Sequence, residues 1–328
     1  LMVDVDTAVP AAPGALDLAT VSDTGSSNTD NITSDTTPTI SGAPVEPGAI
    51  VTLYDSDGTT VLGTTVADGS GNWSITPSSV LSSGVHNFTT KQTDTAGNQG
   101  PASAPLAVTI VTGAPIPGTP DLTTLTDSGI SSGDNLTNDP TPDFSVSGVD
   151  GNTISVFADV NNDGVFNAGD IALGSAVVAG GVATITAAPD MLDGPYVIRA
   201  TQTDLGGNVS AASSPLAITI DTVVPSTATP ALDLITADDS GSSSTDNRTN
   251  KTAYTINATG LEPGATVELK EGATVIATAI VSAGGTASFS LTGATEGAHN
   301  YVVAQTDAAG NVSTTATLLT VTVDVTAP

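Results

Sequence analysis

The chain contains no cysteine, which excludes disulfide bonds and thiolate metal sites. Only 3% of its 328 residues are aromatic, so apolar cores must be built from valine, isoleucine, leucine and alanine, and several small cores are expected rather than one large one. No run of about 18 apolar residues occurs, and we predict no membrane insertion. The start, LMVDVDTAVP, lacks the basic and apolar stretches of a signal peptide, and from the abrupt ends we expect a segment of a longer protein.

Basic residues are also scarce, since five Lys and Arg stand against 34 Asp and Glu, for a net charge of −29. We therefore expect no nucleic-acid or anionic-membrane partner, because almost nothing could neutralise phosphate groups. Carboxylates at this density repel one another in a folded chain, and divalent cations are the obvious counter-charge. Glu, Lys and Arg favour helices, whereas the abundant Thr, Ser, Gly, Asp and Asn favour strands and turns. The composition therefore predicts an all-β protein.

Three strings recur along the chain, which indicates internal repeats. QTDTAGN recurs as QTDLGGN and QTDAAGN, SDTGSSNTDNIT as TDSGISSGDNLT and DDSGSSSTDNRT, and PLAVTIVT as PLAITIDT. Successive copies of the first string are 110 and 103 residues apart. We therefore predict three tandem modules, at residues 1–111, 112–220 and 221–328.

Each module has the pattern of about seven short strands separated by turns. In the first module the runs are LDL, TPTISGAPV, AIVTLYD, TTVLGTTVA, NWSITPSSV, HNFTTKQTD and PLAVTIVT, and turn sequences such as EPG, SDG and TAGN lie between them. Seven strands in roughly 100 residues predict an Ig-like β-sandwich, although the Cys and Trp signature of antibody domains is absent. Proline-rich joints such as GAPIPGTP predict short, stiff linkers. We therefore expect three sandwiches arranged as an extended rod.

The recurring strings resemble those of bacterial Ig-like repeats. The resemblance is carried by DTxxP linkers, SGxSxxDNxT segments, EPGAxV turns, one GNW and TDxAGN turns, and it covers all three modules. Such repeats build the extender regions of large RTX-type surface adhesins and biofilm proteins. The resemblance implies secretion to the bacterial cell surface, a rod that projects a distal binding domain, and Ca²⁺ bound at the joints between modules.

One loop of the second module, DVNNDGVFNAGD, has the oxygen spacing of an EF-hand calcium loop, although no helix is predicted on either side. Oxygen-bearing side chains stand at its first, third, fifth, ninth and twelfth places, and a glycine stands at its sixth. Aspartate in place of glutamate at the twelfth place shortens the side chain that would bind the ion through two oxygens. The alternative is an Asn/Asp-rich hairpin turn without metal. The expected Ca²⁺ ligands are Asp159, Asn161, Asp163, the Val165 carbonyl, Asn167 and Asp170.

Acidic residues also recur near both ends of every module. In an Ig-like sandwich the loop after the first strand and the turn before the last strand lie at opposite poles, so these elements of consecutive modules should face one another. Carboxylates that converge there without Lys or Arg would repel one another unless a hard cation lies among them. The loop acids are Asp23, Asp30, Asp127, Asp134, Asp239 and Asp246. The turn residues are Asp94, Asn98, Asp204, Asn208, Asp307 and Asn311.

The linkers differ at one position that bears on this hypothesis. Asp221 belongs to the linker of the second joint, where we expect an interdomain Ca²⁺ ion, and Asp324 would act in the same way beyond the third module. At the first joint Val111 replaces the aspartate, so we expect a weaker site or one completed by backbone carbonyls, and a more flexible joint. The alternative is that these Asp and Asn residues serve only as turn formers.

Catalysis finds little support, and we predict that the protein is not an enzyme. No GxSxG, SxxK or HExxH motif occurs, and acids repeated in every module indicate structure rather than a glycosidase site. His86 and His299 share a repeat position with Tyr196, which favours a half-buried structural place, and we expect Trp73 to cap a core. The leading hypothesis is a monomeric, extracellular extender segment whose partners are its own neighbouring repeats. The alternatives are a carbohydrate- or protein-binding module and an accessory region of a secreted polysaccharide-degrading enzyme.

Overall fold

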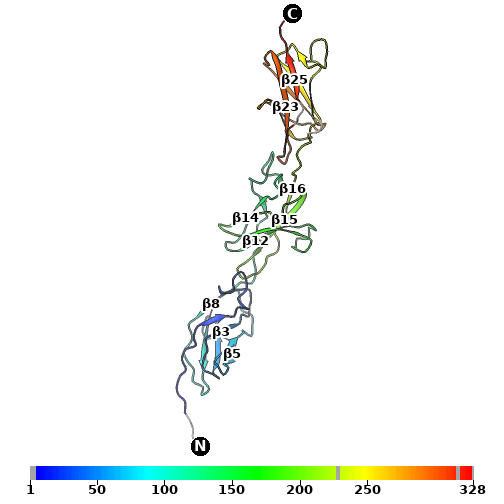
Figure 1. Ribbon diagram of the computed structural model, residues 1–328. Helices are drawn as coiled ribbons and strands as arrows, with labels where there is room; N and C mark the ends of the chain where they lie inside the picture. The colour runs from blue at the N-terminus through cyan, green and yellow to red at the C-terminus, as the bar shows by residue number, and fades with distance from the viewer. Residues whose placement is uncertain (1–4, 227–229, 315–317, 327–328) are drawn as a thin grey trace.

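The computed structural model describes residues 5–226, 230–314 and 318–326. It contains three modules that lie end to end, with the first module at one end of the molecule and the third at the other (Figure 1). Over these residues the chain forms strands and turns but no helix, and so no helix that could cross a membrane. The predicted all-β chain of three tandem Ig-like sandwiches in an extended arrangement is confirmed.

Module 1 has two sheets, whose strand orders are β1-β3-β6 and β2-β8-β7-β4-β5. The strands of the smaller sheet are β1 (Leu16–Leu18), β3 (Ile40–Gly42) and β6 (Ser74–Ile75). The strands of the larger sheet are β2 (Ile32–Thr33), β8 (Leu106–Ile110), β7 (Gly84–Thr93), β4 (Ile50–Tyr54) and β5 (Val61–Val66).

Modules 2 and 3 repeat this topology, with smaller sheets β14-β11-β9 and β17-β19-β22 and larger sheets β10-β16-β15-β12-β13 and β18-β25-β23-β20-β21. The strands of module 2 are β9 (Asp121–Leu122), β10 (Leu136–Thr137), β11 (Asp143–Ser147), β12 (Thr153–Ala158), β13 (Ile171–Val177), β14 (Val182–Thr186), β15 (Gly194–Thr203) and β16 (Leu216–Ile220). The strands of module 3 are β17 (Ala231–Leu234), β18 (Arg248–Thr249), β19 (Tyr254–Thr259), β20 (Thr266–Glu271), β21 (Thr274–Ile280), β22 (Thr286–Leu291), β23 (Gly297–Thr306), β24 (Val312–Thr314), which pairs with β23, and β25 (Leu319–Val323).

Sequence analysis missed the same strand in every module, and in module 3 it also missed β24. The second strand, β2, β10 or β18, has only two residues and pairs in parallel with the last strand of the module. It lies in the segments DNIT, DNLT and DNRT, which are too short for a periodic apolar signal. An asparagine with positive φ precedes each of these strands and turns the chain onto the larger sheet; these residues are Asn31, Asn135 and Asn247.

Each module encloses its own hydrophobic core between its two sheets. The core residues alternate along the strands with exposed ones, as in β14, because successive side chains of a strand point to opposite faces. The largest fully buried side chains are phenylalanines, one per module: Phe88, Phe144 and Phe289. Trp73 closes the core of module 1, where it is 6% exposed and its indole Nε1 donates to the Ala43 carbonyl at 3.2 Å. The expectations of several small cores and of a core-capping Trp73 are therefore confirmed.

Candidate functional site: the joints between modules

Two short elements of each module build the joints. The first loop connects the first two strands and comprises residues 19–31, 123–135 and 235–247 in the three modules. The last turn follows the long strand β7, β15 or β23 and comprises residues 94–98, 204–208 and 307–311.

At both joints the first loop of one module contacts the last turn of the next. The Thr24 hydroxyl of module 1 donates to the Gly206 carbonyl of module 2 at 2.9 Å. The Ser128 hydroxyl of module 2 donates in the same way to the Ala309 carbonyl of module 3 at 2.7 Å. The two elements therefore lie together at each joint, as the positions of the repeats predicted.

A glycine in the first loop allows this close approach. A Cβ atom at Gly25 would lie 2.1 Å from the Leu205 carbonyl oxygen, and one at Gly129 would lie 2.0 Å from the Ala308 carbonyl oxygen. Both glycines have positive φ, which other residues adopt only with strain. The equivalent Gly241 of module 3 also has positive φ, but its Cβ would meet no atom of the described residues within 4 Å. The glycine is thus needed for packing at the two joints and only for backbone conformation at the third position.

The last turn also holds the linker that enters its module. The Asn208 side-chain amide donates to the Val111 carbonyl at 2.8 Å, and that of Asn311 donates to the Asp221 carbonyl at 2.7 Å. Asn98 makes the equivalent contact with the Asp6 carbonyl at 3.1 Å. Because the acceptor is a backbone carbonyl, this contact survives the replacement of the linker aspartate by valine at the first joint.

Within the last turns, Asp and Asn also act as turn formers. The Asp307 carboxylate accepts the backbone N–H and the side-chain amide of Asn311, each at 2.9 Å, and Asp204 and Asn208 are bonded alike. Asp307 is only 2% exposed. The turn-forming role, which sequence analysis offered as the alternative to metal binding, is therefore present in the structure. The hydrogen bonds of these turns also orient the carboxylates.

A glutamate beside the last turn of module 3 escaped sequence analysis. Partial burial raises the pKa of Glu262, and the carboxylates of Asp307 and Asp221 raise it further. These three acids thus form one electrostatic cluster, which spans the linker, the EPG turn and the last turn. The EPG turn could have marked Glu262, because it recurs in module 1, where Glu46 occupies the same place. Module 2 has Val149 at this position.

The first loops carry a second set of carboxylates. Asp23 and Asp127 are buried, whereas Asp30 and Asp134 are exposed and accept backbone N–H groups two residues further on. The charged groups that raise the pKa of Asp127, after burial itself, are Asp134 and Asp121 of the same module. In the described part of the chain, no three His, Cys, Asp or Glu side chains are already arranged as a metal site.

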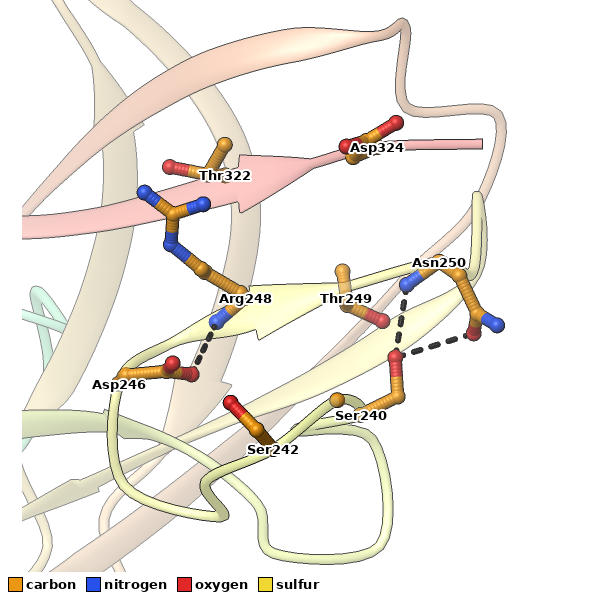
Figure 2. Close-up of a pocket in the computed structure, with 9 residues that line it drawn as sticks. Ser240, Ser242, Asp246, Arg248, Thr249, Asn250, Thr322 and Asp324 are labelled. Carbon is orange, nitrogen blue, oxygen red and sulfur yellow. Dashed lines mark hydrogen bonds between the residues drawn. The ribbon is translucent and has the colours of Figure 1, made fainter. Parts of the chain in front are cut away.

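The outer pole of module 3 presents the corresponding first-loop surface (Figure 2). Its open hollow is lined by Asp246, Arg248, Asn250 and Asp324, among others. Here the Ser240 hydroxyl, equivalent to Thr24 and Ser128, donates to the Asn250 side-chain oxygen at 3.0 Å instead of to a carbonyl of another module. The Asn250 backbone N–H donates to it at 2.8 Å.

The loop with calcium-like spacing connects β12 to β13 as a hairpin insertion of the larger sheet. Asp159 accepts the backbone N–H groups of Asp163 at 3.1 Å and of Gly164 at 2.9 Å. Both carboxylate oxygens of Asp170 accept backbone N–H groups of the loop. Gly164 has a φ of 76°, so the glycine at the sixth place makes the turn that was predicted for it.

The remaining predicted ligands lie in the same hairpin. Asn161 and Asn167 each donate a side-chain amide to Asp163 at 2.9 Å, and Asn167 also donates to the Val165 carbonyl at 3.1 Å. The loop therefore brings its six oxygen-bearing positions together, and its own donors occupy several of those oxygens.

Arg199 is a partner of this loop that sequence analysis missed. Its Nε lies 2.7 Å from Asp159, whose side chain is fully buried. Burial acts to raise the pKa of Asp159, but the Gly164 N–H and the Arg199 guanidinium hold it below its ordinary value. Arg199 lies on β15, 40 residues further along the chain, so nothing in the loop sequence identifies it. The Arg199 guanidinium thus already neutralises Asp159, which stands at the first place of the loop.

The two histidines occupy a structural place. Both ring nitrogens of His86 face acceptors, since Nδ1 lies 2.9 Å from the Asp55 carboxylate and Nε2 lies 2.9 Å from the Ser82 carbonyl. His299 is held in the same way by a carboxylate and a backbone carbonyl. At the same register in module 2, the Tyr196 hydroxyl donates to a backbone carbonyl. Burial acts to lower the pKa of His86, but its two acceptors raise it above the ordinary value.

The chain belongs to the family of bacterial Ig-like domains, whose model matches residues 9–112, 114–222 and 226–325. It is therefore a tandem array of three such domains in one chain. No curated protein matches its sequence.

Several solved structures match at low identity. A tetra-tandem repeat in the extending region of a large adhesion protein is 18% identical, and the match covers 96% of this chain and 74% of that one, with a TM-score of 0.28. The fibronectin(III)-like modules of Clostridium thermocellum CbhA are also 18% identical, with 57% and 86% covered and a TM-score of 0.33. A biofilm-associated protein BSP domain is 14% identical, with 89% and 64% covered and a TM-score of 0.23.

Proposed function

We propose that the chain is a structural extender segment of an extracellular bacterial adhesin, which projects a distal binding domain from the cell surface. The observation that carries this proposal is the repeated joint, in which a hydroxyl of one first loop donates to a last-turn carbonyl of the next module. The same contact at two successive joints sets a common relation between neighbours and extends the chain in one direction (Figure 1). Such an array serves as a long, stiff spacer rather than as a catalyst.

Bound Ca²⁺ rigidifies the second joint in this proposal. The ligands would come from the cluster of Asp221, Glu262 and Asp307, with Asn311 and the facing first loop of module 2 beside it. This donor set consists of oxygen atoms only, which suits a hard divalent cation. Burial raises the pKa of Glu262 and repulsion by Asp307 and Asp221 raises it further, and a cation would relieve this repulsion.

The first joint is proposed to hold its interdomain ion more weakly. Module 2 has Val111 in the linker and Val149 in the turn, where module 3 has Asp221 and Glu262. Only Asp204 remains of the three acids at this place. The hydrogen bonds from Thr24 and Asn208 are still made there, so the joint keeps its contact while losing most of its charge.

The inserted loop is proposed as a further Ca²⁺ site, held by the six residues of the sequence prediction. The approach of several loop oxygens supports it, whereas Arg199 beside Asp159 supplies part of the counter-charge and should weaken the affinity. Extracellular calcium modules commonly have dissociation constants of about 10⁻⁴–10⁻³ M, which match millimolar Ca²⁺ outside cells. At tenfold excess over the dissociation constant, each ion that binds only the folded state adds about 1.4 kcal/mol to its stability.

In this proposal the outer pole of module 3, whose lining residues are shown in Figure 2, receives the last turn of another module of this kind. Ser240, Gly241 and Asp324 stand in the places that Ser128, Gly129 and Asp221 occupy at the second joint. The space that a last turn fills there is open at this pole.

Small-angle X-ray scattering and thermal melts in Ca²⁺ and in EDTA test the proposal. We expect an extended particle in Ca²⁺, and more bending with a lower melting temperature in EDTA. Asp221→Asn should reduce both differences, whereas the matched control Asp324→Asn, at the pole without a neighbour, should leave the scattering unchanged. Identical scattering and melting with and without Ca²⁺ would sink the calcium part of the proposal. A compact or strongly bent particle in Ca²⁺ would refute the proposal that the chain is an extender segment.

A further inference from the structure

One side of each sandwich, where an edge strand of the larger sheet lies beside an edge strand of the smaller sheet, differs between the modules. These strands are β5 and β6 in module 1, β13 and β14 in module 2, and β21 and β22 in module 3. In module 1 a backbone hydrogen bond closes this side, because the Ser78 N–H donates to the Leu62 carbonyl at 3.3 Å. In module 2 the Ala188 N–H donates in the same way to the Leu173 carbonyl at 2.8 Å. The chain that leaves the smaller sheet therefore fills the gap in both modules.

A glycine on the larger sheet permits this closure. A Cβ atom at Gly63 would lie 2.7 Å from Cγ2 of Ile75, and one at Gly174 would lie 2.9 Å from Cγ2 of Ile185. Module 3 has Ala277 at this place in the strand. Its methyl group is incompatible with the close packing of the two edge strands that modules 1 and 2 show.

The same side of module 3 is open. In the described part of the chain, no backbone hydrogen bond joins β21 to residues 290–295. Ile276 is the bulged residue of β21, as Leu62 is in β5 and Leu173 in β13. Ile276 is 36% exposed, whereas Leu62 is 5% exposed and Leu173 is fully buried. Module 3 thus presents an apolar side chain and a strand edge to solvent where the other two modules cover both.

A hollow of about 520 Å³ lies at this open side, which is a size typical of ligand pockets. Ile276 of β21 and Leu291 of β22 line it, together with Tyr301 and His299 of β23. Among the described residues that line it, Glu271 is the one acid, and its side chain is 40% exposed. The hollow therefore combines an apolar surface and a strand edge with one accessible carboxylate.

We propose that this open side of module 3 binds an extended segment of another protein. The segment takes the place that the module's own chain occupies in modules 1 and 2, where Pro77 and Ala187 bury small apolar side chains. It donates a backbone N–H to the Ile276 carbonyl and covers the Ile276 side chain, in the manner of a strand added to a sheet edge.

The charge of the chain selects among such segments. Glu271 favours a basic residue beside it, and the net charge of −29 disfavours an acidic segment. The site goes beyond the proposed spacer role, because it gives one module of the array a partner of its own. It uses no residue of the joints.

NMR spectroscopy of the full chain tests the proposal with the synthetic peptide KTITAAK, which carries residues 184–188 of module 2 between two lysines. The chain has two histidines at one repeat position, and each gives its own imidazole signals. The His299 signals should shift with a dissociation constant of about 1 mM or tighter, because His299 lines the hollow. The His86 signals should stay unchanged, because the chain itself closes that side of module 1. No shift at His299, or equal shifts at both histidines, would overturn the proposal.

Two controls separate backbone pairing from attraction between charges. The same peptide, methylated on the backbone nitrogen of the alanine that copies Ala188, keeps its charge and should no longer shift the His299 signals. Ile276→Ser should weaken binding about fivefold or more, whereas Val275→Ser, which changes a 43% exposed side chain outside the hollow, should not. Equal binding of the two peptides, or equal effects of the two variants, would contradict the pairing. His299 signals that change with the concentration of the chain alone would assign the site to a second copy and overturn the proposed partner.

Discussion

The joint contact can be broken by one methyl group, through the variant Gly129→Ala. The new Cβ would lie 2.0 Å from the Ala308 carbonyl oxygen, about 1.4 Å short of the closest ordinary contact. Backbone atoms form this contact on one side, so rotamer changes cannot relieve it, and the two modules must separate. The hydrogen bond from Ser128 to Ala309, worth about 1 kcal/mol, is then lost as well. Alanine at a positive φ adds strain of about 1 kcal/mol within module 2.

Gly241→Ala serves as the control for backbone strain. Gly241 has a φ of 121° and occupies the same loop position, but its Cβ would meet no atom within 4 Å in the part of the chain that the structure describes. Small-angle scattering should therefore show a shorter maximum dimension and a broader distance distribution for Gly129→Ala, and no change for Gly241→Ala. Gly25→Ala should act like Gly129→Ala, at the first joint. Equal scattering profiles for Gly129→Ala and Gly241→Ala would refute the joint described above.

Two further predictions concern single modules. The folded-state pKa values of His86 and His299 are raised, so their stabilisation is complete below the unfolded value of about 6.5 and is lost as pH rises through the folded value. NMR titration of the imidazole protons should give values above 6.5 for both histidines, and a value at or below 6.5 would contradict the bonding at both ring nitrogens. Arg199→Gln should destabilise module 2 in EDTA, because Asp159 would remain as a buried anion with fewer partners, and Ca²⁺ should restore more stability than in the unmodified chain. Unchanged Ca²⁺ dependence of that variant's melting would show that the inserted loop gains no ion in place of the arginine.

Much of the joint could be read from the repeats. The strings containing Ser128, Asp307 and their equivalents recur at similar spacing, and a sandwich with short linkers places them at facing poles. Their apposition is therefore a consequence of topology, which regular strand and turn patterns specify. The turn-forming role of Asp307 and Asn311 was also readable, because it involves residues only four positions apart.

Other parts of the candidate site depend on pairs of residues for which the sequence carries no local signal. Arg199 reaches Asp159 from another strand, and Glu262 reaches Asp221 and Asp307 through the packing of three separate segments. Such pairs arise from distant positions that the fold brings together, so neither composition nor spacing identifies them. The two-residue strands preceded by a positive-φ asparagine were missed for a different reason, since they are too short to show an alternation of apolar and polar residues.

The sequence by itself determined the all-β class, the three modules, the small aliphatic cores and the positions of the acidic loops and turns. These follow from local physical chemistry: alternation of apolar side chains, turn residues with special φ values, and the near absence of basic residues. Only the tertiary structure decided how those acids divide, into a cluster with Glu262 at the second joint and, in the first loops, a buried Asp23 or Asp127 with an exposed Asp30 or Asp134. Burial and the identity of distant neighbours set the charge balance of a carboxylate, and both exist only once the sheets have packed and the modules have met.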